Sequence, residues 1–365
     1  MRAVPRITLV VLYGGRSAEH DVSRVTASHV LRAADPARYD IVPVAIDRDG
    51  RWHRADDVRA LLSSGAAALP ESLPVDGPET DPTPLLQTAG PTAGDAPVVA
   101  LPLLHGPFGE DGTVQGLLEL AGVPYVGAGV LASALAMDKA KAKEVFAFNG
   151  IPQAAWLTFR AGDLPDDLAE QVAAGLGYPC FVKPSNMGSS VGVSKVHRPS
   201  ELADAVALAA SYDEWILVEE AVDGREIELA VLGNLEPEVS VAGEIIPGAE
   251  FYDYDDKYHD GRAELVIPAS LPEALQARFQ QLAVAAYRAC RAEGLARVDF
   301  FLEESGRARG PLLNEVNTIP GFTPISMYPK LWAASGLPYG ALLDRLVDLA
   351  LERHRRRGAI TRTDR

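Results

Sequence analysis

Cysteine is scarce in this sequence, with only Cys180 and Cys290 among 365 residues. Neither belongs to a CxxC pair or a histidine-rich segment, which favours buried free thiols in a reducing compartment over a disulfide or a metal site. Long apolar runs are missing too, because none approaches the roughly 18–20 residues of a membrane span. The first run, residues 7–12, is too short for a signal peptide. We therefore expect a cytoplasmic protein with no membrane partner.

Positive charge is also in short supply. The 34 basic residues, only seven of them lysine, stand against 50 acidic ones, and the formal net charge of −16 argues against a nucleic-acid partner. With 47% hydrophobic and 23% charged residues, the composition is typical of a globular protein with a large core. The length suggests two or three domains.

The first third of the chain alternates strands with helices. Apolar runs predict strands at 7–13, 39–46 and 98–104, and helical periodicity predicts helices at 21–33 and 113–121. This alternation implies a mostly parallel sheet with helices on its faces.

A predicted helix at 131–149 separates this region from a more finely divided remainder. The expected strands are 155–159, 180–183, 191–196, 215–219, 226–232 and 238–245, and the expected helices are 166–175, 200–211, 272–293 and 339–356. Residues 65–97, rich in Pro, Gly, Ala and Thr, indicate a surface excursion to which we assign no role. We expect domains over 1–130, 131–218 and 219–358, followed by a frayed tail at 359–365.

Two later strands carry polar residues with metal-binding chemistry. Glu315 and Asn317 are two positions apart in an otherwise apolar run, so in an extended strand they project to the same side. Asp299 on a neighbouring strand could bring a second carboxylate to the same point. Hard oxygen ligands of this kind suit Mg²⁺, which fills its remaining positions with water and substrate phosphates. The alternative is a pair of strand ends that carry solvated acids.

Residues 181–193 indicate a strand, a small polar loop and a second strand. Gly188 and Gly192 allow close approach of the backbone, whose N–H groups could cradle an anion together with two hydroxyls. Lys183 could supply a point charge to a phosphate. The segment is not GxxxxGK[ST] and no helix follows it, which excludes a P-loop. A flexible hairpin tip is the alternative.

Four further segments have patterns that allow binding but do not require it. A hinge and strand at 219–228 could read an adenine edge and accept from ribose hydroxyls, or form an exposed acidic edge. Turns at 14–21 and 105–112 lie where ligand clefts of open α/β sheets form. In the first turn Glu19 favours a cationic ligand such as an ammonium group, whereas His105 in the second is as often structural. Residues 250–258 suit a mobile lid or an ordinary surface loop.

Together these segments resemble the D-alanine–D-alanine ligases of the ATP-grasp superfamily. The resemblance covers nearly the whole chain and rests on seven motifs in order, namely GGRSAEHDVS, HGPFGEDG, MDKAKAK, KPSNMGSSVGVSKV, EFYDYDDKY, ARVDFF and NEVNTIPGFTPISMYPKLW. It implies an α/β fold with α+β elements, in a three-domain ATP-grasp architecture with an N-terminal parallel-sheet domain. It also implies that ATP binds between the central and C-terminal domains.

The resemblance further implies a two-step reaction. The carboxylate of one D-alanine attacks the γ-phosphate of ATP to give D-alanyl phosphate and ADP. The amine of a second D-alanine attacks this acyl phosphate and releases phosphate and a dipeptide for peptidoglycan synthesis. Two Mg²⁺ or Mn²⁺ ions are the implied cofactors, and a homodimer is the implied assembly.

The same resemblance implies roles for individual residues at the nucleotide. Lys143 and Lys183 would contact the ATP phosphates, while Asp299, Glu315 and Asn317 would hold the two metal ions. The adenine and ribose would be bound by Glu219, Glu220, Val222 and Glu226, with Ser189 and Lys257 also at the nucleotide. Ala221 stands where some relatives have an aromatic residue, so stacking on the adenine at this position is in doubt.

At the amino acids, Glu19 would bind the first ammonium group within a network with Ser189 and Tyr258 that holds the lid shut. The other implied contacts are Ser326 and Met327 to the second carboxylate, His105 near the first substrate, and Arg297 with the Gly321 N–H at the oxyanion of the tetrahedral intermediate. Tyr258 or a phosphate oxygen could take the proton of the second amine.

Three alternatives stay open at this point. A D-alanine–D-lactate or D-alanine–D-serine ligase would share the architecture, although the lid with Tyr258 favours the dipeptide. Another ATP-grasp carboxylate–amine ligase would keep the metal and ATP segments without Glu19 or the 105–112 turn. A nucleotide-binding protein without turnover is the third, and the intact set of Arg297 and the metal ligands argues against it.

Overall fold

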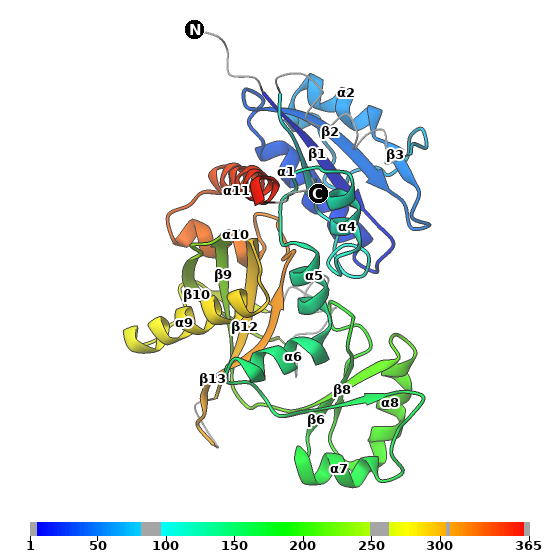
Figure 1. Cartoon of the computed structure of the whole chain (residues 1–365), viewed down its shortest axis with the longest axis vertical. Coiled ribbons are helices and arrows are strands. Elements are labelled where there is room, and N and C mark those ends of the chain that lie inside the picture. The colour runs from blue at the N-terminus through cyan, green and yellow to red at the C-terminus, as the bar shows by residue number, and fades with distance from the viewer. Residues whose placement is uncertain (1–5, 82–95, 249–262, 304–306, 361–365) are drawn as a thin grey trace.

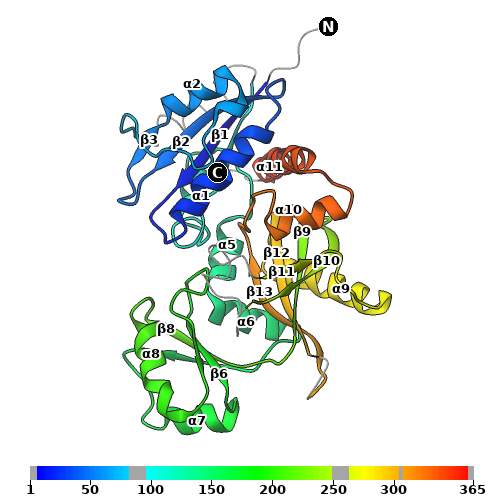
Figure 2. The same ribbon diagram turned by 180° about the vertical axis from the view of Figure 1, so that it is seen from behind.

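The computed structural model describes residues 6–81, 96–248, 263–303 and 307–360. Three sheets with their helices are arranged along the long axis of the molecule (Figures 1 and 2). The predicted α/β fold with an N-terminal parallel sheet is confirmed. The predicted lid at 250–258, with Lys257 and Tyr258, lies outside the described residues.

The N-terminal sheet has the strand order β3-β2-β1-β4. Its strands are β1 (Ile7–Gly14), β2 (Tyr39–Ile46), β3 (Trp52–Arg54) and β4 (Val98–Pro102). β1 pairs in parallel with β2 and β4, and β3 runs antiparallel to β2. Helices α1 (His20–Ala33), α2 (Asp56–Ser64) and α4 (Thr113–Leu120) accompany this sheet. A Cβ atom at Gly14 would collide with the Ile46 carbonyl oxygen, so the first strand has to end on a glycine.

The predicted surface excursion at 65–97 is wrong for its first part. After a 3₁₀ turn at Ala66–Ala68, Leu69 and Leu73 are buried in the N-terminal core. Arg24 on α1 donates to the Leu73 carbonyl at 2.6 Å, which ties this segment to the helix. The high proline and glycine content of this segment indicated a loop, although Leu69 and Leu73 make apolar contacts with the core. Residues 82–95 lie outside the described part of the chain.

The helix predicted at 131–149 is two helices, α5 (Val130–Met137) and α6 (Lys139–Phe148). Asp138 between them is extended, with ψ 95°, and its carboxylate accepts from the Lys141 N–H at 3.1 Å. An aspartate that caps a helix in this way starts a new helix and ends the previous one.

The central sheet is antiparallel, in the order β5-β8-β6-β7. Its strands are β5 (Trp156–Arg160), β6 (Cys180–Pro184), β7 (Ser194–Val196) and β8 (Trp215–Glu220), and α7 (Leu168–Gly175) and α8 (Leu202–Ala210) pack on it. β7 begins at Ser194, three residues later than predicted, because Gly192 inside the predicted strand has a positive φ. The predicted domain boundary at 218/219 falls inside β8, and the division into domains stays a prediction.

The third sheet is also antiparallel, in the order β11-β10-β9-β12-β13. Its strands are β9 (Arg225–Gly233), β10 (Glu238–Ile246), β11 (Glu264–Val266), β12 (Gly294–Glu303) and β13 (Gly310–Asn317). Helix α9 (Glu273–Ala289) packs Phe279 edge-on against Phe300 of β12, with ring centroids 5.3 Å apart. Helix α10 (Met327–Ala334) was not predicted. It lies within the motif NEVNTIPGFTPISMYPKLW, from which only the roles of side chains were inferred.

The C-terminal helix α11 (Tyr339–Ile360) joins the first and third sheets, and it runs past the predicted end at 356. Leu342 and Leu346 belong to the same hydrophobic core as Leu9 and Val11 of β1. The Tyr39 hydroxyl donates to Asp344 at 2.5 Å, which adds a polar contact to this packing. The two ends of the chain therefore share one core.

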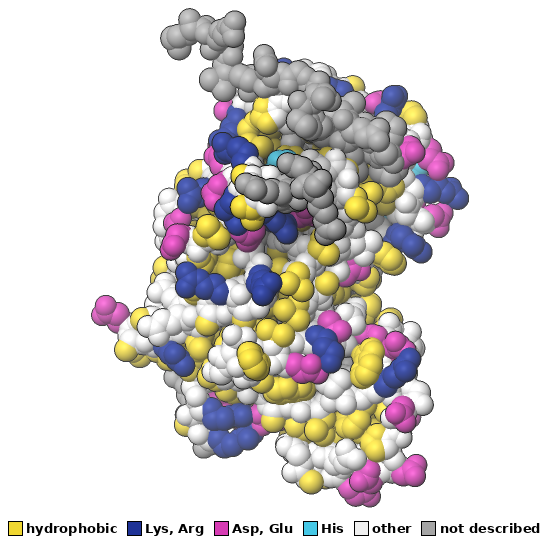
Figure 3. Space-filling view, in the orientation of Figure 1, with side chains coloured by type: hydrophobic (Ala, Val, Ile, Leu, Met, Phe, Trp, Pro, Cys, Tyr) yellow, Lys and Arg dark blue, Asp and Glu magenta, His cyan; other side chains and the backbone are white. Residues whose placement is uncertain are grey.

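The two cysteines are buried and unpaired, as predicted. Burial raises the pKa of Cys180 to about 11 and that of Cys290 to about 12, so both thiols stay protonated at neutral pH. Acidic and basic side chains are interspersed over the face shown in Figure 3. Within the described ranges, no helix is long and apolar enough to cross a membrane.

Candidate active site

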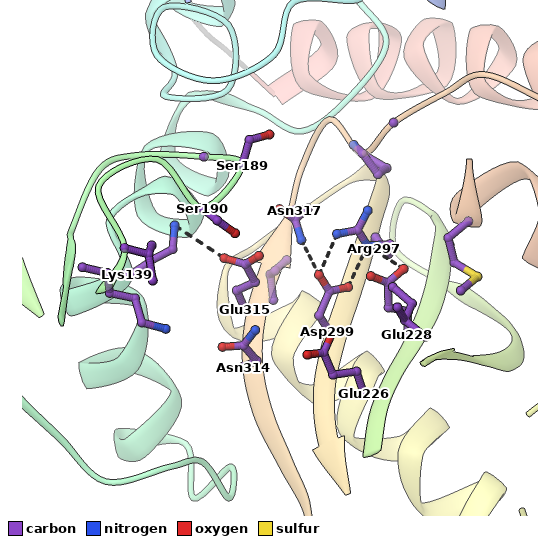
Figure 4. A pocket seen from close by; sticks show the side chains of 18 of the residues that line it. Lys139, Ser189, Ser190, Glu226, Glu228, Arg297, Asp299, Asn314, Glu315 and Asn317 are labelled. Atoms are coloured by element: carbon purple, nitrogen blue, oxygen red, sulfur yellow. Dashed lines mark hydrogen bonds and ion pairs between the residues drawn. The ribbon is translucent and has the colours of Figure 1, made fainter. Parts of the chain in front are cut away.

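A cleft of about 1430 Å³ lies where the three sheets meet. Its walls come from α1, the loop between β6 and β7, the β8–β9 connection, strands β12 and β13, and the start of α10. Figure 4 shows that the side chains of Arg297, Asp299, Glu315 and Asn317 gather on the two strands of its floor. These elements are far apart in sequence, so the cleft exists only in the folded chain.

One end of the cleft is built on the buried carboxylate of Glu219. Lys183 on β6 lies 2.6 Å from its Oε2, and Lys143 on α6 contacts its Oε1. Both Lys143 and Glu219 are only 2% exposed. Burial lowers the pKa of Lys143, whereas for Glu219 the charges of the two lysines outweigh burial and lower its pKa. The two ammonium groups outnumber the carboxylate, and Lys183 and Glu219, but not Lys143, are among the residues that line the cleft.

The Glu219 carboxylate is engaged by Lys143 and Lys183, so it holds the two ammonium groups in place. The binding of adenine by this segment stays a prediction. Glu220 is likewise occupied, since its carboxylate accepts from the Ala155 N–H at 2.8 Å and pairs with Arg309 at 2.5 Å and with Arg307. Any contact of this segment with adenine therefore falls chiefly to its backbone and to Val222, which lines the cleft.

The floor of the cleft is the β12–β13 pair, in which Asp299 stands opposite Glu315 and Arg297 opposite Asn317. Arg297 holds Asp299 through two hydrogen bonds of 2.8 and 2.7 Å, and the Asn317 amide donates to Asp299 at 2.8 Å. The register shifts between Asp299 and Phe300, so Asn314 has no cross-strand partner and β13 contains a bulge. The bulge keeps the two carboxylates level with each other.

The donors on this floor fit a divalent metal ion. Two carboxylates and one amide are hard oxygen ligands on adjacent strands. In the described residues, no group of three or more His, Cys, Asp or Glu side chains could hold a metal by itself. An ion here would thus need the Asn317 amide, water and phosphate oxygens to complete its coordination.

Glu228 on β9 is a site residue that sequence reasoning missed. It stands opposite Asp299 in the β9–β12 pair, is buried, and forms an ion pair with Arg297 at 3.0 Å. Burial lowers the pKa of Arg297, but the charges of Asp299 and Glu228 outweigh it and hold that pKa well above its ordinary value. The spacing of Glu226 and Glu228, two residues apart on one strand, was the available signal, and both line the cleft.

The other end of the cleft is built on the carboxylate of Glu19, next to the first helix. Ser189 from the β6–β7 loop donates to Glu19 at 2.6 Å, so the structure brings together these two residues of the predicted network. A Cβ atom at Gly106 or at Gly188 would stand 3.1 Å from Glu19 Oε2, so glycines at both positions allow the carboxylate to sit close to the backbone. The backbone of Ser189 itself is in the left-handed region, with φ 50°.

His105 lies behind this carboxylate and is 4% exposed. Its Nδ1 is 3.1 Å from the Ile319 carbonyl oxygen and 3.7 Å from Glu110. Burial alone would lower the pKa of His105, but Glu110 and the charge of Glu19 outweigh it and raise that pKa above its ordinary value. This end therefore holds two carboxylates and one histidine, a balance that favours a cationic group.

Gly321, Ser326 and Met327 follow β13 and line the same cleft. Ser326 accepts from the Thr323 N–H at 3.2 Å, and its Oγ would stand 3.0 Å from a Cβ atom at position 321. The glycine therefore keeps the backbone close to the side chain expected to bind a carboxylate.

The fold and this site define a class of enzymes, the ATP-grasp ligases, which hold ATP between two α+β domains. The family model for the D-ala D-ala ligase N-terminus matches residues 8–128, and that for the D-ala D-ala ligase C-terminus matches residues 145–348. The chain belongs to the D-alanine–D-alanine ligase family.

Individual relatives agree with this assignment. The D-alanine–D-alanine ligase of Geobacillus thermodenitrificans is 48% identical, over 97% of this chain and 98% of its own. The structure of the D-alanine–D-alanine ligase from Coxiella burnetii has a TM-score of 0.78 at 35% identity and covers 97% of both chains. The VanG D-Ala:D-Ser ligase from Enterococcus faecalis has a TM-score of 0.79 at 34% identity, over 94% of this chain and 99% of its own.

Proposed function

We propose that this chain joins two molecules of D-alanine to D-alanyl-D-alanine with ATP, releasing ADP and phosphate, for the synthesis of peptidoglycan precursors. The observation that carries the proposal is a cleft lined at one end by Lys183, which pairs with Glu219 together with the buried Lys143, and at the other end by Glu19. A nucleotide and an amino acid can thus be held at one site, with the floor strands between them.

At the cationic end, Lys143 and Lys183 bind phosphate oxygens. Glu219 fixes the two ammonium groups and keeps them from repelling each other. The backbone of 219–222 reads the adenine and Glu226 accepts from the ribose. Asp299, Glu315 and Asn317 would hold two divalent ions, Mg²⁺ or Mn²⁺, and such ions would supply positive charge to offset the charge on the transferred phosphoryl group.

At the anionic end, Glu19 accepts from the ammonium group of the first D-alanine, with His105 beside it, and Ser189 keeps the Glu19 carboxylate in place. The carboxylate of this D-alanine attacks the γ-phosphorus, the bond to the β–γ bridging oxygen breaks, and D-alanyl phosphate and ADP form. Tyr258 and Lys257, outside the described residues, are proposed to close the site and to contact the nucleotide.

The second D-alanine is held through its carboxylate by Ser326 and Met327. Its amine attacks the acyl carbon, and Arg297 and the Gly321 N–H stabilise the resulting oxyanion. Arg297 suits this role because Asp299 and Glu228 keep its guanidinium charged and fixed in orientation. Inorganic phosphate leaves, and the amine proton passes to Tyr258 or to a phosphate oxygen.

The acceptor is the point at which D-alanine competes with D-lactate and D-serine, because a D-Ala:D-Ser ligase has the same fold. The test is phosphate release from ATP with D-alanine alone and with D-lactate or D-serine added, followed by analysis of the products. D-Alanyl-D-alanine should be the main product at neutral pH in every mixture. Depsipeptide or D-alanyl-D-serine as the main product would overturn the choice of acceptor, and no phosphate release with any amino acid would favour a binding protein.

The same proposal includes a homodimer that works in the cytoplasm, as members of this family are expected to do. Light scattering on the purified protein tests the assembly. The mass of two chains is expected, and the mass of one chain at micromolar concentration would overturn it.

A further inference from the structure

The outer edge of the N-terminal sheet is covered by a short segment of the chain. β3 is the last strand on that side, and residues 77–81, here called the edge segment, meet it in an antiparallel bridge between His53 and Glu79. Two backbone hydrogen bonds, of 2.8 and 3.0 Å, join β3 to the Thr80 N–H and to the Pro78 carbonyl oxygen. The edge segment thus pairs with backbone groups that an open edge strand would leave exposed.

The His53 side chain holds the edge segment through both of its ring nitrogens. Nδ1 lies 3.1 Å from the Gly77 carbonyl oxygen, and Nε2 lies 3.0 Å from the carboxylate of Asp47, which begins the turn between β2 and β3. Both partners are acceptors, whereas a neutral imidazole has one N–H group and one lone pair. Only the protonated imidazolium can therefore donate to both partners at once.

The charges around His53 favour the protonated form. The hydrogen bond to Asp47 and the charges of Asp47 and Glu79 raise the pKa of His53 above its ordinary value, although burial alone would lower it. The two basic residues that flank His53 on this edge, Arg51 and Arg54, each pair with another carboxylate. The balance of charge at this imidazole is therefore negative.

The chain just before the edge segment is held by groups that do not titrate near neutral pH. Arg24 and Arg32 of α1 donate to the carbonyl oxygens of Leu73 and Leu69 at 2.6 and 2.7 Å. An arginine side chain stays charged at every pH that the folded protein meets. Deprotonation of His53 thus weakens the hold on the edge segment and leaves the preceding part fixed to α1.

We propose that His53 is a pH-sensitive latch, which holds the edge segment on β3 while its imidazole is protonated and releases it on deprotonation. In the closed latch the imidazolium bridges Asp47 and Gly77. Loss of the proton leaves a ring lone pair facing an oxygen acceptor, so one of the two contacts becomes repulsive and this edge of the sheet opens. None of these three residues lines the cleft, and the latch does not depend on the proposed function.

The first test follows the His53 imidazole by NMR in the full-length protein, together with hydrogen exchange corrected for the pH dependence of the intrinsic rate. The latch should be complete below the ordinary histidine pKa of about 6.5 and be lost as the pH rises through the raised folded value. Protection of the edge segment should fall on the order of tenfold as His53 loses its proton, while protection of residues 69–73 stays within about twofold. A His53 pKa at or below the ordinary value overturns the latch, and so does protection that ignores the titration.

The variant Asp47→Asn gives a sharper test, because it should reverse the pH dependence. Asp47 Oδ1 accepts from the Asp49 and Arg51 N–H groups at 2.9 Å each, and asparagine keeps this acceptor while placing an amide donor toward His53. A donor at this position suits the neutral imidazole, so the edge segment should be protected at pH 9 and loosened at pH 6. The same pH dependence as in the unmodified protein would overturn the latch.

Two further variants control for indirect effects. His53→Gln has no titrating group at this position, so protection of the edge segment should become independent of pH, and an alkaline loss that persists in this variant overturns the latch. Asp49→Asn is the matched control, since Asp49 is on the same turn and its side chain is 76% exposed. It should leave the midpoint of the opening unchanged, and a midpoint that moves as far as in Asp47→Asn would show that the net charge of the turn, and not the contact with His53, sets the pH dependence.

Discussion

Each end of the cleft contains a buried carboxylate, but the balance of charge around that carboxylate is opposite at the two ends. At the phosphate end, Glu219 lies between Lys143 and Lys183, and the cations outnumber the anion. At the proposed amino-acid end, Glu19 accepts from the neutral hydroxyl of Ser189, and its charge acts on His105 and Glu110. Here the carboxylates outnumber the histidine.

This difference shows how one cleft can sort its ligands. A surplus of positive charge attracts phosphates and a surplus of negative charge attracts an ammonium group. In the proposed reaction each ligand is directed to its own end, and the reacting groups would meet over β12 and β13.

The largest effect is expected at the floor. Glu315→Gln removes a charge that the proposed metal ions require, and with it their stabilisation of the transferred phosphoryl group, so kcat should fall by about 10²- to 10³-fold. Steady-state kinetics measures this, with Glu214→Gln as the control because Glu214 is exposed and pairs with Arg160. Activity within a few-fold of the unmodified enzyme would show that the floor is misplaced.

A smaller effect is expected at the phosphate end. Lys183→Met removes a charged hydrogen bond to a phosphate, which is worth about 1.5–3 kcal/mol, and should raise KM for ATP by about 10- to 100-fold. KM for D-alanine should change little, and Lys141→Met should leave both constants unchanged. An equal rise in both constants would contradict the separation of the two ends.

The complementary change is Glu19→Gln at the amino-acid end. Glutamine retains an acceptor for Ser189 but loses the charge, so KM for the first D-alanine should rise by about tenfold while KM for ATP stays within about twofold. Glu144→Gln on the exposed side of α6 is the control. If KM for ATP rose instead, Glu19 would belong to the nucleotide site.

The smallest effect is on the pH dependence of stability, where the two ends should differ in sign. The lowered pKa of Glu219 gives stability that is present above its ordinary pKa and is lost as the pH falls through the folded value. The raised pKa of His105 gives stability that is complete below its ordinary pKa and is lost as the pH rises through the folded value.

Urea unfolding between pH 4 and pH 9 tests this difference. His105→Gln should reduce the loss on the alkaline side and leave the acidic side as it was. An unchanged alkaline side would mean that His105 is not held by Glu110 and Glu19.

Much of the site could be predicted because its signals are local. The two-residue spacing of Glu315 and Asn317 depends only on strand geometry, and β13 supplies it despite the bulge at Asn314. The contact between Glu19 and Ser189 was expected only through the resemblance to a family. The residues are 170 positions apart, and no local pattern connects them.

The parts that were missed depend on how distant elements converge. Glu219 reads as the start of a hinge, and only the packing of α6 against β6 and β8 brings two lysines to its carboxylate. In the sequence, Glu228 is one of several acidic residues on a predicted strand. Only the pairing of β9 with β12 places Arg297 beside it. The break between α5 and α6 at Asp138 depends on the local sequence and could have been predicted, because an aspartate before a new helical turn is a common cap.

The most direct test of the account uses D-alanine labelled with ¹⁸O in its carboxylate, with ATP and Mg²⁺. If this carboxylate attacks the γ-phosphate and the acyl phosphate is then broken by an amine, one ¹⁸O atom moves into each phosphate released. We predict D-alanyl-D-alanine together with phosphate that carries a single ¹⁸O. Dipeptide formation with unlabelled phosphate would contradict the proposed order of events at this cleft.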